Sequence, residues 1–152
     1  MDEHAQILGI IRSKNASPLE LDPKRTALLV VDMQRYFTQP SHAFTDLFET
    51  LSPGAARGYL ARVREIVVPA IHKLLQAFRA GGGPVVFTAV GTESGDGREL
   101  PHWLRSLDQL GLAVVGKRVW PPITDPSWAI DDALRPLPHE VVLNKLSAGA
   151  FA

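Results

Sequence analysis

The sequence predicts an α/β fold built on a parallel sheet, and three observations predict it. Apolar runs of strand length occur at 26–31, 85–90 and 140–145. Each run is continuous instead of alternating, which is typical of strands covered on both faces of a sheet. The segments between the runs are long and contain helical patterns, so each connection can cross over to a parallel neighbour in the right-handed sense.

At the N-terminus, residues 1–25 are predicted to form a helix and a lead-in to the sheet. Residues 3–13 have the pattern of a short helix lying over the outside of the fold. The first strand covers 26–31 and is followed directly by Asp32. The sheet domain is therefore expected to occupy residues 26–152.

The middle of the chain is predicted to hold a loop, a helix and the second strand. Segment 33–58 contains prolines and glycine among aromatic residues, and we expect a long loop with one helical turn. Apolar residues recur at i, i+3, i+4 spacing over 60–78, which predicts an amphipathic helix. Pro69 is expected to kink this helix or to begin it. The Gly-Gly-Gly-Pro sequence at 81–84 ends the helix before the strand at 85–90.

The last third of the chain is predicted to return to the sheet after two short helices. A weak helical pattern covers 99–110, and 113–115 has the pattern of a brief extended piece. A proline-rich loop then precedes a predicted helix around 128–134. The third strand follows at 140–145.

The composition is that of an ordinary globular domain, with 45% hydrophobic and 21% charged residues. Sixteen basic and sixteen acidic residues give zero formal net charge, so charge draws the chain neither to nucleic acid nor to an anionic membrane. No apolar run approaches the ~20 residues of a membrane span, and the start lacks the pattern of a signal peptide. We therefore expect a cytoplasmic protein without nucleic acid or membrane partners. The chain has no cysteine, which excludes disulfides and a cysteine nucleophile within these residues.

Two charged residues end strands of the predicted sheet. Asp32 follows the first strand and Lys145 ends the third. Ligands of open α/β sheets bind outside the carboxyl ends of the strands, where these two side chains would meet. A nearby ammonium keeps a carboxylate ionised and able to act as a general base. On spacing alone, a turn-capping Asp32 and a solvated Lys145 are an equally good interpretation.

The sequences around these two residues resemble the isochorismatase-like hydrolases. The segment 29–37 reads LVVDMQRYF, which is similar to the family's opening signature of an apolar strand, Asp-Met-Gln and an aromatic residue. The segment 142–151 reads VLNKLSAGAF, which is similar to its second signature, where a lysine ends a strand before small residues and a phenylalanine. Segments 66–71 and 125–130 resemble the family in the matching order, and the resemblance runs from about Thr26 to the last residue.

The resemblance implies a three-layer α/β/α, Rossmann-like domain and a catalytic set of aspartate, lysine and cysteine. Asp32 would take the thiol proton, Lys145 would stabilise the charged intermediate, and a cysteine thiolate would attack an amide or ureido carbon. Gln34, Phe37 and Trp128 would contact substrate, although core packing is the commoner use of such a tryptophan. The expected function is hydrolysis of a small-molecule C–N bond.

The resemblance covers only the family's N-terminal part, because the fourth strand and the cysteine that follows it have no counterpart in these residues. We therefore expect a C-terminal segment or another chain to complete the domain, and a homo-oligomer by resemblance. Two alternatives stay open: a vinyl-ether hydrolase of the isochorismatase type, which uses no cysteine, and an inactive fragment that serves as a binding or assembly module.

No metal or cofactor is expected. Relatives that bind a metal carry Asp-x-His after the second strand, whereas segment 88–94 contains no histidine. The histidines elsewhere in the chain do not have the spacing of metal ligands. No glycine-rich phosphate motif joins a strand to a helix, which argues against a dinucleotide or nucleotide cofactor.

Overall fold

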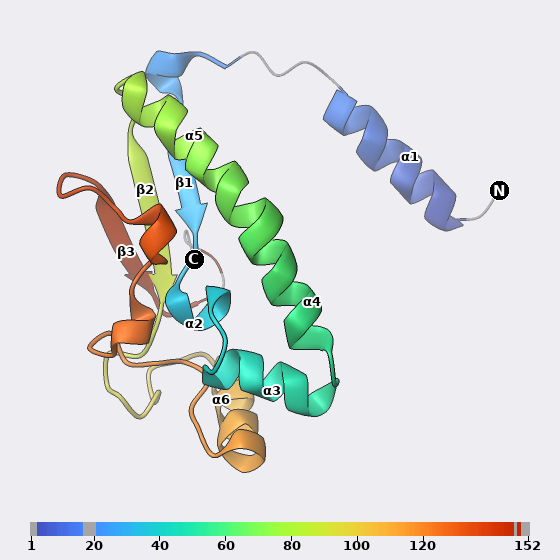
Figure 1. The fold of residues 1–152 in the computed structure, drawn as a ribbon, viewed down its shortest axis with the longest axis vertical. Helices are drawn as coiled ribbons and strands as arrows, with labels where there is room; N and C mark the ends of the chain where they lie inside the picture. The colour runs from blue at the N-terminus through green and yellow to red at the C-terminus, as the bar shows by residue number, and fades with distance from the viewer. Residues whose placement is uncertain (1–2, 17–20, 148, 150–152) are drawn as a thin grey trace.

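The computed structural model describes residues 3–16, 21–147 and 149 and contains one parallel sheet (Figure 1). The strand order is β1-β2-β3, so β2 is central and each neighbour runs parallel to it. The predicted α/β class and parallel sheet are confirmed. The strands are β1 (Leu28–Val31), β2 (Val85–Val90) and β3 (Val141–Lys145).

Six α-helices lie in the described part of the chain, and α4 continues into α5 through one π-helical turn, Val63–Val67. Short 3₁₀ turns precede β1 and occupy the connection before β3. The helices are α1 (Glu3–Ala16), α2 (Arg35–Thr38), α3 (Ala43–Leu51), α4 (Ala55–Arg62), α5 (Val68–Ala80) and α6 (His102–Val115), and the 3₁₀ turns are Pro23–Arg25, Pro126–Trp128 and Asp132–Leu134.

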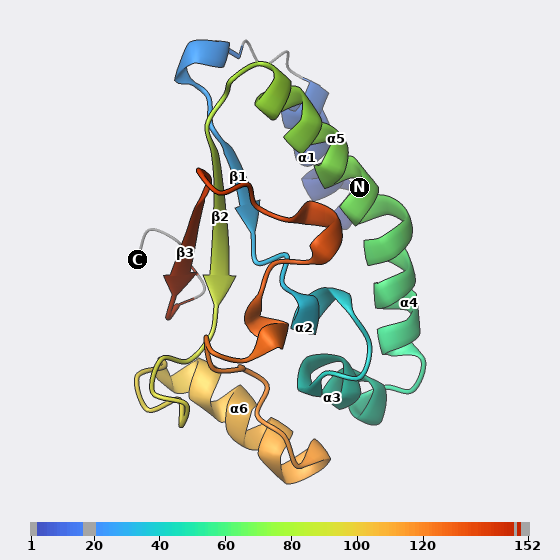
Figure 2. The same cartoon turned by 60° about the vertical axis from the view of Figure 1, so that its left-hand side comes forward.

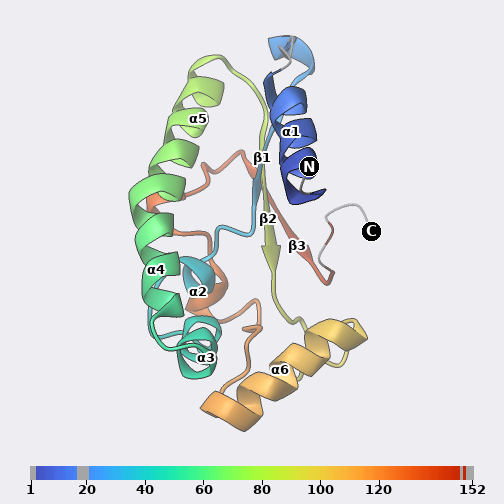
Figure 3. The same cartoon turned by 90° about the vertical axis from the view of Figure 1, so that its right-hand side faces the viewer.

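The long α4–α5 helix lies along one face of the sheet, as Figures 2 and 3 show. The core between them consists of apolar side chains from α5, the strands and the connection before β3 (Val30, Leu75, Val85, Phe87, Ile130 and Leu134). A second core lies below the carboxyl ends of the strands and includes Tyr36, Leu47, Val90, Leu104 and Trp120. It anchors the short helices and α6 at the end of the sheet where Asp32 and Lys145 lie.

The opposite face of the sheet carries exposed apolar side chains, which we call the uncovered face. Leu29, Val31, Val141 and Leu143 are 37%, 50%, 49% and 50% exposed. The register places Val31, Thr88 and Leu143 side by side across the three strands. Helix α1 stands apart from the sheet, and its own apolar side chains Ile7 and Ile10 are exposed (Figure 1).

The prediction of a long loop over 33–58 was wrong, because α2, α3 and the beginning of α4 lie there. Pro40 and Pro53 lie between these helices and not inside them. At the N-terminus of α3, the His42 N–H donates to the Thr45 hydroxyl at 3.3 Å, and this hydroxyl donates to His42 O at 3.0 Å. Its apolar face packs against α6, a contact distant in sequence. No local sequence pattern indicates this contact.

Two smaller predictions also need correction. The extended piece expected at 113–115 is the last turn of α6, which ends at the left-handed Gly116. The helix expected around 128–134 is replaced by two 3₁₀ turns, because Ile130 forms an isolated bridge with Gln34 between them. Pro69 lies at the N-terminus of α5 after the π-helical turn, so the expected interruption is present without a break in the helix.

No helix among the described residues has both the length and the apolarity to cross a membrane. The second signature extends beyond the described chain at Ala148, Ala150 and Phe151.

A partly buried ion pair joins the C-terminal end of α5 to the beginning of β3. Arg79 donates two hydrogen bonds of 2.8 Å to the two carboxylate oxygens of Glu140, whose side chain is 2% exposed. The Leu137 N–H donates to the same carboxylate at 2.8 Å. The Arg79 hydrogen bond is the main cause that lowers the pKa of Glu140 below its ordinary value of 4.5.

We expect Glu140→Gln to lower the free energy of unfolding at pH 7 by about 2 kcal/mol, because it removes a charge-assisted bidentate contact. A lowered folded-state pKa stabilises the fold above the ordinary pKa, and this contribution is lost as the pH falls through the lowered value. Urea unfolding should therefore give a constant difference between the two proteins from pH 6 to 8 and a shrinking one below about pH 4. Glu65→Gln, which changes an exposed pair with Arg64, is the control and should have little effect. A difference that is independent of pH would contradict the assignment.

Candidate active site

Asp32 lies where β1 ends, and its backbone is left-handed with φ at +53°. This conformation is uncommon for a residue other than glycine, although aspartate and asparagine adopt it more readily than most. Two backbone hydrogen bonds hold it in place: the Asp32 N–H donates to Thr88 O at 3.1 Å, and the Gln34 N–H donates to Asp32 O at 2.8 Å. The chain therefore leaves the strand at Asp32 with the carboxylate fixed at the edge of the sheet.

Lys145 forms an ion pair with Asp32, which is one of the two interpretations that their positions in the sequence allowed. The distance from Lys145 Nζ to Asp32 Oδ2 is 2.7 Å, with side chains 9% and 22% exposed. β1 and β3 are two strand spacings apart, about 9.5 Å, so the long lysine side chain reaches across β2. Lys145 Nζ also donates to Ser147 O at 3.0 Å. The structure thus brings an acidic and a basic side chain together at the carboxyl ends of parallel strands.

Thr88 is a third member of this cluster, and sequence reasoning missed it. Its hydroxyl donates to Asp32 Oδ1 at 2.8 Å, and the residue is 1% exposed. The only sequence signal is a polar residue inside the apolar run of β2. Threonine is common in strands, so that signal is not specific.

Gln34 is fully buried and joins the loop after β1 to the end of β2. Its Nε2 donates to Val90 O at 3.1 Å and to Trp128 O at 2.6 Å, while its Oε1 accepts from the Val90 N–H at 2.7 Å. Both side-chain N–H groups are thus used inside the protein. The geometry favours a positioning role for Gln34 over direct contact with substrate.

Phe37 belongs to an aromatic cluster beside the second core. Its ring centroid lies 4.1 Å from that of Tyr36 and 4.6 Å from that of Phe44. The Tyr36 hydroxyl donates to Val90 O at 3.1 Å. Burial, followed by the negative charge of Asp32, raises the pKa of Tyr36 well above its ordinary value. Tyr36 is therefore a neutral donor close to Asp32, and Phe37 packs against it.

Trp128 lies over the first residue of the loop after β2. Its Nε1 donates to Oδ1 of Asn144 at 3.0 Å, and Asn144 directly precedes Lys145 in the sequence. A side chain on Gly91 would place its Cβ 2.3 Å from Trp128 Cδ1, so only glycine allows this approach. Trp128 is partly buried and stays a candidate for lining a substrate pocket.

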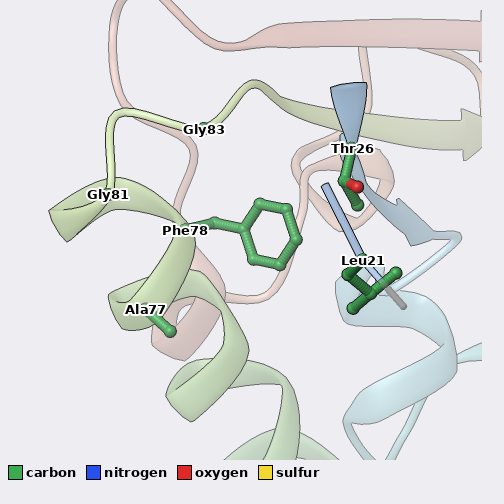
Figure 4. A pocket seen from close by; sticks show the side chains of 6 residues that line it. All are labelled: Leu21, Thr26, Ala77, Phe78, Gly81 and Gly83. Carbon is green, nitrogen blue, oxygen red and sulfur yellow. The ribbon is translucent and has the colours of Figure 1, made fainter. Parts of the chain in front are cut away.

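An apolar groove lies at the other end of the sheet, far from these residues. Leu21 and Thr26 line it from the lead-in to β1, and Phe78 points toward them from α5 (Figure 4). Because β1 and β2 begin at that end, the groove lies opposite the carboxyl edge where Asp32 is found. It has no charged lining residue and gives no support for catalysis there.

The described part of the chain contains no cluster of residues that could bind a metal ion. No three or more His, Cys, Asp or Glu side chains group there in a way that could hold an ion. The arrangement around Asp32 can accept a proton and stabilise a neighbouring negative charge.

Residues 26–152 match the family model of the isochorismatase domain. The chain is 26% identical over 146 residues to ureidoacrylate amidohydrolase RutB of Caulobacter vibrioides, a match that covers 88% of this chain and 58% of that protein. It is 29% identical over 149 residues to RutB of Pseudomonas savastanoi pv. phaseolicola, with 88% and 53% covered. The chain therefore spans just over half the length of these curated relatives.

Solved structures of similar fold include a cysteine hydrolase from Pseudomonas syringae pv. phaseolicola, with a TM-score of 0.56 and 24% identity. That match covers 86% of this chain and 52% of the other. An isochorismatase family protein from Desulfovibrio vulgaris gives a TM-score of 0.53 at 23% identity, with 82% and 54% covered. At these identities the matches establish a shared fold.

Proposed function

Because this chain belongs to the isochorismatase family, we propose that it supplies Asp32 and Lys145 to a hydrolase that cleaves a small amide or ureido C–N bond. The observation that carries the proposal is the 2.7 Å contact between Lys145 Nζ and Asp32 Oδ2 at the carboxyl edge of the sheet. The curated relatives are named as amidohydrolases of a ureido compound, which supports a C–N bond as the target.

In the proposed reaction, Asp32 is the general base and Lys145 stabilises negative charge. A cysteine supplied from outside residues 1–152 gives its thiol proton to Asp32, and the thiolate attacks the carbonyl carbon. The ammonium of Lys145 lies close enough to Asp32 to stabilise the negative charge that develops on the carbonyl oxygen. The C–N bond then breaks, and the amine leaves with the proton that Asp32 took from the thiol. Asp32 next takes a proton from water as the water oxygen attacks the thioester carbon, and it returns this proton to sulfur when the C–S bond breaks.

The test is an assay of the full-length gene product on a panel of ureidoacrylate, other small amides and isochorismate. The expected result is release of ammonia or an amine from at least one amide or ureido compound. Turnover of isochorismate alone would replace this proposal with the vinyl-ether reaction. A folded product that turns over none of the panel would leave the binding-module interpretation as the better one.

The uncovered face supports a second part of the proposal, that a further segment or chain completes the domain. Leu29, Val31, Val141 and Leu143 form a contiguous apolar surface that leads directly to the Asp32–Lys145 pair. A free apolar edge and face of this kind favours association with another segment. The matches cover only 58% of the curated relative from Caulobacter vibrioides and 52% of the solved cysteine hydrolase. The covering segment would also form a wall of the site.

We expect Leu143→Glu to lower the free energy of unfolding of the full-length gene product by about 2 kcal/mol or more, because a covered face would bury the new carboxylate. Ile66→Glu, at a similarly exposed position (52%) in the π-helical turn, is the control and should change it little. Chemical unfolding of the two variants measures both effects. Equal, small effects would mean that the face is in contact with solvent.

A further inference from the structure

Thr88 contacts both the backbone and the side chain of Asp32. Its carbonyl accepts the Asp32 N–H at 3.1 Å, and its hydroxyl donates to Asp32 Oδ1 at 2.8 Å. Thr88 lies in the central strand, where it pairs with Val31 on one side and with Leu143 on the other. Thr88 is 1% exposed, so the protein encloses it.

The direction of the hydroxyl proton follows from its partner. An ionised carboxylate only accepts hydrogen bonds, and a hydroxyl has one proton to donate. Thr88 therefore gives that proton to Asp32 Oδ1. Lys145 lies on the other oxygen, with its Nζ 2.7 Å from Oδ2. The two oxygens of Asp32, which are equivalent in free aspartate, are thus distinguished by their neighbours.

We propose that Thr88 is a positioning residue for the reaction, which holds the Asp32 carboxylate through Oδ1 in the orientation that takes the proton. This inference rests on the proposed function of Asp32 as general base. The terminal torsion of an aspartate side chain is broad, so without a fixed partner the carboxylate would rotate. Proton transfer requires hydrogen-bond reach and alignment, which rotation of the carboxylate would disturb. The hydroxyl of Thr88 touches no reacting atom and acts through Asp32 alone.

The test compares Thr88→Val with Thr88→Ser in the full-length gene product. Valine keeps the shape and the stiff branched side chain but has no hydroxyl, whereas serine keeps the hydroxyl. We expect Thr88→Val to lower kcat by roughly ten- to hundred-fold with KM changed by no more than about twofold. Thr88→Ser should restore most of the lost kcat. Thr88→Ala provides the same comparison with serine if the valine variant does not fold.

Thr92→Val is the matched control, because Thr92 is 0% exposed and its Oγ1 has no hydrogen-bond partner among the described residues. It should leave kcat unchanged. A kcat of Thr88→Val within about twofold of the wild type would overturn the inference, as would a folded Thr88→Ser as impaired as the valine variant. Asp32→Asn separates the two proposals. If that variant is fully active, the general-base function fails, but if it is inactive and Thr88→Val is unimpaired, only the role of Thr88 fails.

Discussion

Replacing Asp32 with asparagine is expected to lower kcat for C–N bond hydrolysis by roughly 10²–10⁴-fold, the usual contribution of a general base. Asparagine has nearly the same shape and can still accept the Thr88 hydrogen bond through its amide oxygen. The amide group cannot take up a proton, however, and its NH₂ would face the ammonium of Lys145. The variant thus removes the proton acceptor and leaves the packing around it largely intact.

Lys145→Ala should produce a loss of similar order for a different reason. It removes the positive charge that lies 2.7 Å from Asp32 and that would stabilise the anionic intermediate of the proposed reaction. Lys117→Ala, at a lysine that is 58% exposed and pairs with Asp46, is the control and should be fully active. Steady-state kinetics of the three variants on one substrate gives the comparison. Undiminished turnover in both Asp32→Asn and Lys145→Ala would contradict the assignment of the site.

The sheet could be predicted from the sequence because it follows from short-range patterns, whereas spacing alone left the Asp32–Lys145 pair open and the two family-like signatures favoured it. Continuous apolar runs identified the strands, and parallel strands place their last residues at the same edge. Asp32 and Lys145 are 113 positions apart, the difference of their numbers, yet each needs only its own strand end to be placed. The structure then supplied the distance between them.

The helices between 33 and 58 could not be predicted in the same way. Helix α3 is nine residues long, which is short for an isolated helix in water, and it depends on packing against α6. The two 3₁₀ turns before β3 have a similar cause, because the Asp131 N–H donates to Met33 O and holds that connection against the loop after β1. Contacts between segments that are distant in sequence determine the secondary structure of both regions.

Thr88 and Gln34 show a second limit of sequence reasoning. Gln34 was expected to contact substrate because of its place in the Asp-Met-Gln signature, whereas its amide is buried against backbone groups. Thr88 had no distinguishing feature in the sequence. Which polar group meets which depends on side-chain direction at the strand ends, and residue type alone does not determine that direction.

The side-chain amide of Gln34 forms the hydrogen bonds to β2 that the backbone of a longer β1 would form. The backbone of β1 ends at Val31, and Asp32 turns left-handed, whereas β2 continues to Val90. The side-chain amide of Gln34 accepts the Val90 N–H at 2.7 Å and donates to Val90 O at 3.1 Å, as a peptide group of a neighbouring strand would. The same amide donates to Trp128 O at 2.6 Å and thus joins a third segment to this end of the sheet.

We therefore expect Gln34→Leu to lower the free energy of unfolding by about 3 kcal/mol, because leucine has a similar size but leaves the Val90 N–H and Trp128 O without their partner in a buried place. The Tyr36 hydroxyl still reaches Val90 O, which limits the loss at that group. Urea unfolding measures the change. Gln76→Leu, on the exposed surface of α5, is the matched control and should alter stability by less than about 0.5 kcal/mol.

The same substitution should also reduce activity, since Gln34 holds the loop that begins at Asp32 against the end of β2. If Gln34 instead contacts substrate, Gln34→Leu will raise KM while stability stays close to that of the wild type. Its location at 0% exposure with both N–H groups bonded to backbone predicts the opposite, a large loss of stability in which the effect on KM is secondary. Unfolding and kinetics measured on the same preparation distinguish a residue that positions the site from one that binds within it.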